Sequence, residues 1–214
     1  MIALSRNRGS QIPAAYWGEG KKMADKKLLV LKKKGPPPNS VSLEFDTKFW
    51  SKAKPCLKKE SNNKCASCEA PTALVAHGDV EHYRPKSLYW WLAYTYDNYL
   101  YACQICNQVH KKDKFPTAGP TLTGKQVTAQ TLDTDLYRLI GLLSPDPVDT
   151  SIGFSLEKYE SDHRSELPYL INPYLDNPET VIAYKVYEGI EQVKAIAKDP
   201  SSPLTWQKWK NAMA

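Results

Sequence analysis

Four of the five cysteines form two pairs with the same spacing, Cys65/Cys68 and Cys103/Cys106. Each pair is a Cys-x-x-Cys knuckle, and four thiolates are the closed tetrahedral set that holds a structural Zn²⁺ ion. A redox dithiol, or cysteines buried as small hydrophobic residues, is the alternative. The sequence shows no membrane span or secretory signal, so we expect a cytoplasmic protein, in which thiols stay reduced. We therefore predict a zinc site and a free Cys56.

Side chains suited to phosphodiester hydrolysis lie around these knuckles. The reaction needs a base, a divalent cation and a residue that orients the base. His82 is the natural base near neutral pH, and Glu81 and Asn107 carry oxygen ligands that suit Mg²⁺ or Mn²⁺. A lone histidine is more often an ordinary surface or core residue. The position of His82 between the knuckles and near Asn98 and Asn107 favours the catalytic interpretation.

The order of these motifs resembles the HNH endonuclease family, which has a ββα-metal fold. The matching pattern is Cys-x-x-Cys, an acidic-His dipeptide, an Asn, and then Cys-x-x-Cys-Asn. The resemblance implies that His82 is the general base and that Glu81 and Asn107 bind the catalytic metal. It also implies that Asn98 braces the loop between the strands, which completes a catalytic set of His82, Asn98 and Asn107.

Longer segments, among them "VEHYRPKS" and "LINPYLDNPE", resemble the HNH proteins of Septu-type and retron-associated antiphage systems. Those proteins work beside an ABC/SMC-like ATPase. The resemblance therefore implies DNA as the substrate and such an ATPase as the partner, and it allows a homodimer within a larger complex. Two residues depart from the family pattern: Glu81 replaces the aspartate of many members, and His110 stands where a lysine is common.

Basic residues near the motifs are candidates for contacts with phosphates as charge-assisted donors. They are Arg84, Lys86, His110, Lys111 and Lys112. The formal net charge of +6 permits a polyanionic partner without requiring one. Seven lysines also lie between Lys21 and Gly35. For these runs, a solvated face is the competing interpretation.

The resemblance implies an α+β fold with a ββα-metal core, and we predict a four-cysteine zinc knuckle beside this core and flanking helices. We expect a flexible basic arm over residues 1–41 and a nuclease domain over 42–180, with its core at 65–116. A C-terminal extension, residues 181–214, is a possible partner contact. Its "WQKWK" places two tryptophans on one face of a helix, and large aromatic residues anchor interfaces.

Individual elements are also predicted. One strand of a hairpin carries Val80 to Tyr83, and a helix begins near Cys103 or Ile105 and carries Asn107. A short helix begins at about Asp46, and apolar spacing favours another helix within residues 131–149. The segment 180–198 begins with strand-like alternation and ends with helical spacing. The aromatic residues of one cluster are expected to lie mostly in the core: Tyr89, Trp90, Trp91, Tyr94 and Tyr96.

The sequence thus predicts a metal-dependent HNH endonuclease that hydrolyses DNA as the effector of an antiphage system. Two alternatives stay open. One is a zinc-organised binding module with a dormant nuclease centre, and the other is an RNase of the same fold. Metal-dependent nicking of plasmid DNA, compared with cleavage of structured RNA, separates the three.

Overall fold

The computed structural model describes residues 1–72, 77–149, 155–187, 192–205 and 208. Its helices are α1 (Gly18–Lys34), α2 (Thr47–Ser51), α3 (Lys54–Glu60), α5 (Asp133–Leu139) and α6 (Leu156–Glu166). Its strands are β1 (Gly78–His82), β2 (Tyr99–Cys103), β3 (Ile182–Tyr187) and β4 (Gln192–Ala197). Short 3₁₀ turns are η1 (Gly9–Gln11), η2 (Ala14–Tyr16), η3 (Trp90–Leu92), η4 (Tyr96–Asn98) and η6 (Pro178–Thr180), and η5 (Ile105–Lys111) is a π-helix. The described chain therefore mixes α and β structure, as predicted.

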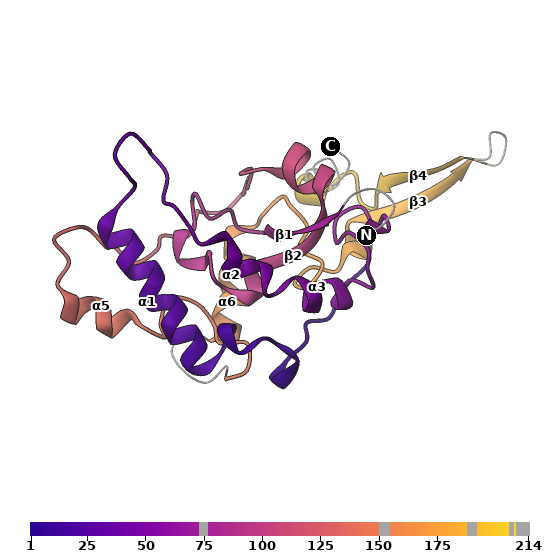
Figure 1. Cartoon of the computed structure of the whole chain (residues 1–214). Coiled ribbons are helices and arrows are strands. Elements are labelled where there is room, and N and C mark those ends of the chain that lie inside the picture. The colour runs from indigo at the N-terminus through magenta and orange to yellow at the C-terminus, as the bar shows by residue number, and fades with distance from the viewer. Residues whose placement is uncertain (73–76, 150–154, 188–191, 206–207, 209–214) are drawn as a thin grey trace.

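The β1–β2 hairpin lies at the centre of the molecule (Figure 1). The strands are antiparallel, with Gly78 opposite Cys103 and His82 opposite Tyr99. All five residues of β2 are buried, so the hairpin is covered by other elements. A Cβ on Gly78 would stand 2.1 Å from the ring of Tyr101, so only glycine fits at this close approach. The predicted strand at Val80 is confirmed, and the strand ends one residue before Tyr83.

Most of the first 41 residues, including η1, η2 and α1, are folded onto the domain, so our expectation of a flexible arm is wrong. Ala24, Leu28 and Leu29 of α1 are buried, as are Ile12 and Tyr16 ahead of it. Residues four apart, such as Ala24 and Leu28, lie on the same side of a helix, and Leu29 widens this side into an apolar stripe. Lys21 is buried in an ion pair with Asp25, whereas Lys22, Lys26 and Lys27 are exposed on the remaining surface of α1. The apolar stripe fixes the helix to the core.

A single large cluster of aromatic and aliphatic side chains joins α1 to the 89–101 segment. All five aromatic residues that were expected in the core, from Tyr89 to Tyr96, are buried. Phe49 of α2 stacks near Tyr94 with ring centroids 4.3 Å apart, and Tyr16 donates a hydrogen bond to the Phe49 carbonyl. The predicted short helix is confirmed, since the Asp46 carboxylate caps α2 by accepting from the Lys48 amide. The predicted helix in residues 131–149 is also confirmed, as α5.

The hairpin of β3 and β4 projects from the rest of the described chain (Figure 1). The predicted strand beginning at residue 182 is confirmed, but the helical spacing predicted for the end of this segment is wrong. Gln192–Ala197 is a strand that pairs with β3. Of the "WQKWK" segment that we expected to contact a partner, all but Lys208 lie outside the described residues.

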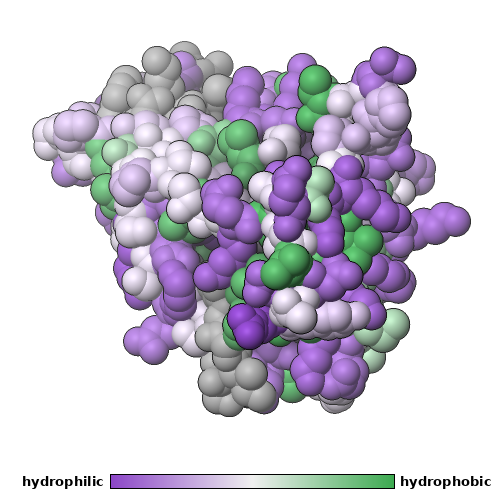
Figure 2. All heavy atoms as spheres, turned by 90° about the vertical axis from the view of Figure 1, so that its left-hand side faces the viewer, coloured by the Kyte–Doolittle hydropathy of each residue, from purple (hydrophilic) through white to green (hydrophobic). Residues whose placement is uncertain are grey.

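The surface beside α1 and α5 is mainly hydrophilic, with separate hydrophobic side chains among the polar ones (Figure 2). Exposed apolar residues of the two helices and their flanks include Met23, Leu132 and Tyr137. No helix in the described part of the chain is long and apolar enough to cross a membrane.

Candidate metal-dependent active site

The four knuckle cysteines come together at one end of the β1–β2 hairpin. Their sulfur atoms all lie within 4.8 Å of one another, and Sγ of Cys68 is 3.9 Å from Sγ of Cys103. A tetrahedral zinc with bonds of about 2.3 Å needs sulfurs about 3.8 Å apart. A hydrogen bond from Cys106 lowers the pKa of Cys65 to about 4, which favours the thiolate that a metal binds. The four residues can therefore hold one zinc ion.

The first knuckle is attached to the hairpin through its backbone. The Ala66 amide donates to the Tyr101 carbonyl at 2.8 Å, and the Cys65 amide donates to the Ala70 carbonyl at 3.0 Å. Cys103 is itself the last residue of β2. The cluster thus clamps the hairpin at the Gly78 end, four residues along β1 from His82.

A pocket of about 430 Å³ opens beside β1 and the first turns of η5. Glu81, His82 and Asn107 all line it. These residues come from the end of β1 and from the helix after β2, so the hairpin and the following helix are what bring them together. The predicted helix that begins near Ile105 and carries Asn107 is confirmed, although it is a π-helix.

His82 is buried and tightly oriented. Its Nε2 lies 3.0 Å from the Ala93 carbonyl, and the rings of Trp50 and Tyr99 meet the imidazole edge-on at centroid distances of 4.9 and 5.1 Å. A carbonyl can only accept, so Nε2 carries the proton in this hydrogen bond and the lone pair is on Nδ1. Burial, with the Lys86 charge, lowers the pKa of His82 to about 3. The imidazole is therefore neutral at neutral pH, the form in which a general base accepts a proton.

Glu81 is a desolvated carboxylate beside a lysine. Its Oε1 lies 2.5 Å from Nζ of Lys111, which also donates to the His82 carbonyl at 2.8 Å. Burial raises the pKa of Glu81 to about 7, against the lowering effect of Lys111. The amide oxygen of Asn107 and this carboxylate are hard ligands on an open pocket, a donor set that suits Mg²⁺ or Mn²⁺. Lys111, which we predicted to contact phosphate, lies directly at this carboxylate.

Asn98 is fully buried and binds the loop between the strands. Its Oδ1 accepts from the Arg84 amide and its Nδ2 donates to the Arg84 carbonyl, each at 2.9 Å. Nδ2 also approaches the Leu92 carbonyl at 3.3 Å. Asn98 thus ties the start of the loop to its end, and its burial keeps it from touching a substrate.

Two of the other predicted phosphate-binding residues line the pocket, and one does not. Lys86 and Lys112 line the pocket, and Nζ of Lys86 stands 5.5 Å from the centre of the Trp50 ring. His110 is exposed on η5 and does not line the pocket.

Arg84 requires a correction. Its side chain is 0% exposed and its Nη2 lies 2.6 Å from Oε2 of Glu166. A guanidinium enclosed in this way cannot reach a phosphate, so the structure does not place Arg84 for the contact that we expected. The basic side chains that line the pocket are instead those of Lys54, Lys86 and Lys112.

Sequence reasoning missed the wall of the pocket formed by α2 and α3. Trp50, Ser51 and Lys54 line this wall, and Asp79 and Gln108 join the other side, with Gln108 donating to Asp79 at 3.0 Å. The alternation of β1 could have placed Asp79 on the same face as Glu81. No local signal links Trp50 to His82, because they meet only through tertiary packing.

Comparison with known proteins gives one informative match. The chain is similar to the Septu protein PtuB of Bacillus mycoides (strain KBAB4), with 38% identity over 90 residues. The match covers 33% of this chain and 30% of that protein, so the chain spans about a third of the length of the curated relative it matches. No family model matches the chain, and no solved structure matches it.

Proposed function

We propose that this protein is a metal-dependent HNH-type endonuclease that hydrolyses DNA phosphodiester bonds. The observation that carries the proposal is the convergence of Glu81, His82 and Asn107 on one open pocket, at the junction of the β1–β2 hairpin and η5. The partial similarity to a Septu protein supports a role in antiphage defence. It also supports action within a defence complex, with an ATPase as the proposed partner.

In this proposal each residue has a separate task. The neutral imidazole of His82 takes a proton from water at Nδ1, while its Nε2–H stays bound to the Ala93 carbonyl. Glu81 and Asn107 would hold the divalent cation. That ion would stabilise the charge that develops on the phosphate and on the leaving oxygen. Lys54, Lys86 and Lys112 around the pocket attract the nucleic-acid backbone.

The zinc site has a structural task in the same proposal. Its soft thiolates form a closed set, whereas the pocket offers hard oxygen ligands and room for water. The two ions are therefore expected to be separable, so that removal of the pocket ion stops cleavage while the zinc stays bound.

The test compares His82→Ala with His77→Ala, the same change at an exposed histidine outside the pocket. Purified chains are incubated with supercoiled plasmid or structured RNA, with Mg²⁺, with Mn²⁺ or without a divalent ion. Loss of a general base typically lowers the rate about 10²–10⁴-fold, so we expect His82→Ala to stop cleavage and His77→Ala to keep it.

Each other result has a defined meaning. Cleavage at the wild-type rate by His82→Ala would contradict the role of this residue. Preference for RNA would favour the RNase alternative. A folded, zinc-loaded wild-type chain that cleaves neither substrate, alone or with the proposed ATPase partner, would favour a binding module with a dormant centre.

A further inference from the structure

We infer that Glu166, the last residue of α6, is a positioning residue for the catalytic histidine. It holds Arg84 and thereby fixes the loop between β1 and β2, whose Ala93 carbonyl orients His82. The inference rests on the proposed nuclease function. It adds an element, α6, that no motif connects with the site.

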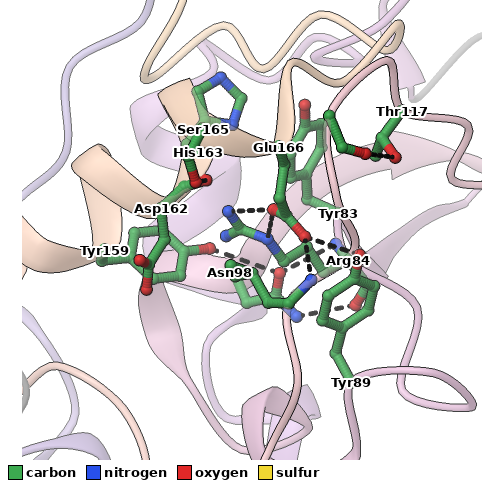
Figure 3. Close-up of polar contacts among 12 residues, drawn as sticks. Tyr83, Arg84, Tyr89, Asn98, Thr117, Tyr159, Asp162, His163, Ser165 and Glu166 are labelled. Atoms are coloured by element: carbon green, nitrogen blue, oxygen red, sulfur yellow. Dashed lines mark hydrogen bonds and ion pairs between the residues drawn. The ribbon is translucent and has the colours of Figure 1, made fainter.

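The Glu166 carboxylate is enclosed by donors on both oxygens (Figure 3). Oε2 accepts from Nε of Arg84 at 2.7 Å and is paired with Nη2 at 2.6 Å. Oε1 accepts from the Tyr89 hydroxyl at 2.7 Å and from the Leu122 amide at 3.3 Å. Both side chains of the ion pair are 0% exposed. The carboxylate therefore ties α6 to two points of the 83–98 loop at once.

Stability alone is a weak reason for such an ion pair. Removing two charges from water costs several kcal/mol for each ion, and well-packed apolar pairs are often as stable or more stable. What a buried, directional pair adds is a defined geometry. Here the geometry concerns the backbone of Arg84, which lies two residues after His82 and just beyond the end of β1.

A continuous set of contacts leads from Glu166 to the imidazole. Arg84 is held by its side chain through Glu166, and its backbone is held on both sides by the Asn98 amide. Asn98 also reaches the carbonyl of Leu92. The next residue, Ala93, presents the carbonyl that accepts from Nε2 of His82.

Other groups support the same arrangement. The ring of Tyr159, also on α6, lies 4.7 Å from the Arg84 guanidinium carbon, and its hydroxyl approaches Oδ1 of Asn98 at 3.4 Å. Figure 3 shows Tyr159 on one side of Arg84 and Tyr89 on the other, with the Glu166 carboxylate between them. Tyr159 and Glu166 of α6 thus both contact Arg84 in the loop, whereas the pocket is lined by His82.

The test uses Glu166→Gln, which keeps the shape and loses the charge, and Tyr89→Phe, which removes one hydrogen bond to Oε1. Glu160→Gln is the matched control, because it makes the same change on the same helix at a partly exposed pair 3.9 Å from Arg164. Thermal melts establish that each variant is folded. The whole chain is used throughout.

Two readouts distinguish positioning from a merely structural role. The first is the separation of kcat from KM on plasmid DNA. We expect kcat of Glu166→Gln to fall on the order of 10–100-fold, because small misplacements of a catalytic group have effects of this size, with little change in KM. The second is the ¹⁵N spectrum of the imidazoles in chain labelled at its four histidines, with His82 assigned by its loss in His82→Ala. The wild-type chain should show His82 with the proton on Nε2, and Glu166→Gln should show mixed tautomers.

An unchanged His82 tautomer, or a kcat within about twofold of wild type in folded Glu166→Gln, would overturn the inference. If Glu166→Gln does not fold, the apolar pair Arg84→Met/Glu166→Met is the next variant, since such replacements often restore folding. Wild-type kcat and a wild-type His82 signal in that pair would show a structural role only. If neither folds, Tyr89→Phe decides, and wild-type values of both readouts in it count against the inference.

The two proposals fail differently. A wild-type chain that cleaves nothing, but whose His82 changes tautomer in Glu166→Gln, would remove the nuclease proposal and leave the positioning role of Glu166. If the wild-type chain cleaves and Glu166→Gln changes neither the His82 tautomer nor kcat, the nuclease proposal stands and the positioning role of Glu166 is wrong.

Discussion

Glu81 is held as a carboxylate in a place that disfavours its charge. Its side chain is 5% exposed, and burial outweighs the attraction of Lys111, so its pKa rises from 4.5 to about 7. Between these two values the unfolded chain releases its proton and the folded chain keeps it. The free energy of unfolding therefore falls as the pH rises through this window, and the full penalty is present above about pH 7.

Glu81→Gln should therefore stabilise the protein while abolishing cleavage. Without added Mg²⁺ or Mn²⁺ at pH 8, we expect a gain in unfolding free energy on the order of 3 kcal/mol, since each pKa unit corresponds to about 1.4 kcal/mol. The gain should shrink toward pH 5, where the folded wild type is already protonated. Urea melts at the two pH values measure this, with exposed Glu44→Gln as the control.

A loss of unfolding free energy in Glu81→Gln at pH 8, instead of a gain, would contradict this prediction. A Glu81→Gln variant that is less stable than the wild type would show that the pair with Lys111 is a net source of stability. Glu81 would then be an ordinary ion-pair partner and a weaker candidate for a metal ligand.

At the scale of elements, we expect zinc binding by the knuckles to decide whether the β1–β2 hairpin forms. An isolated two-stranded sheet is marginal in water, and here the cysteine cluster closes one end of it. Structural zinc binding is coupled to folding, so its binding free energy stabilises the fold. Cys103→Ser should thus lose zinc and leave the chain unfolded or aggregated.

Cys56→Ser provides the matched control for this prediction. Cys56 lies outside the cluster, and its thiol donates a hydrogen bond to the Gln11 carbonyl that a serine hydroxyl can keep. We expect about one zinc per chain by elemental analysis and a wild-type melt for Cys56→Ser. A cooperative, wild-type melt of Cys103→Ser in excess chelator would remove zinc from the account of the fold.

The elements that the sequence predicted correctly are those with a local signal. The hairpin strand and η5 were anticipated because the knuckle and His82 motifs mark them, and α5 because its apolar spacing is helical. The helix α1 was missed because its lysine runs suggested a solvated arm, although Ala24 and Leu28 already formed an apolar stripe. The end of residues 180–198 was wrongly predicted as a helix, because the spacing of its apolar residues is compatible with both a helix and a strand. Pairing with β3 makes this segment a strand.

The candidate site divides in the same way. The sequence predicted that Glu81, His82 and Asn107 belong to one site, because their spacing from the cysteine pairs is a local pattern. The sequence did not predict the pairing of Arg84 with Glu166, because Glu166 is 82 residues away and no local pattern links the two. The pocket wall at Trp50 was missed for the same reason. Local sequence patterns do not predict ion pairs or pocket walls that form only through tertiary packing.

At the scale of the whole molecule, the N-terminal segment holds the end of the β1–β2 loop against neighbouring elements. Arg6 pairs with Glu60 of α3 at 3.0 Å, and its Nη2 donates to the carbonyls of Asp97 and Tyr99, on either side of Asn98. Its guanidinium also lies 3.5 Å from the centre of the Tyr174 ring. One residue near the start of the chain thus joins α3, the end of the β1–β2 loop and the 170–179 segment.

Arg6→Ala should consequently destabilise the whole domain. It leaves the fully buried Glu60 carboxylate without its cationic partner, and breaking a buried pair from one side typically costs about 3–5 kcal/mol. Arg138→Ala is the control, because its pair with Asp135 is exposed and surface pairs contribute about 0–1 kcal/mol. Urea unfolding followed by tryptophan fluorescence compares the two. A loss below about 1 kcal/mol for Arg6→Ala would mean that the buried Arg6–Glu60 pair contributes no more to stability than a surface pair.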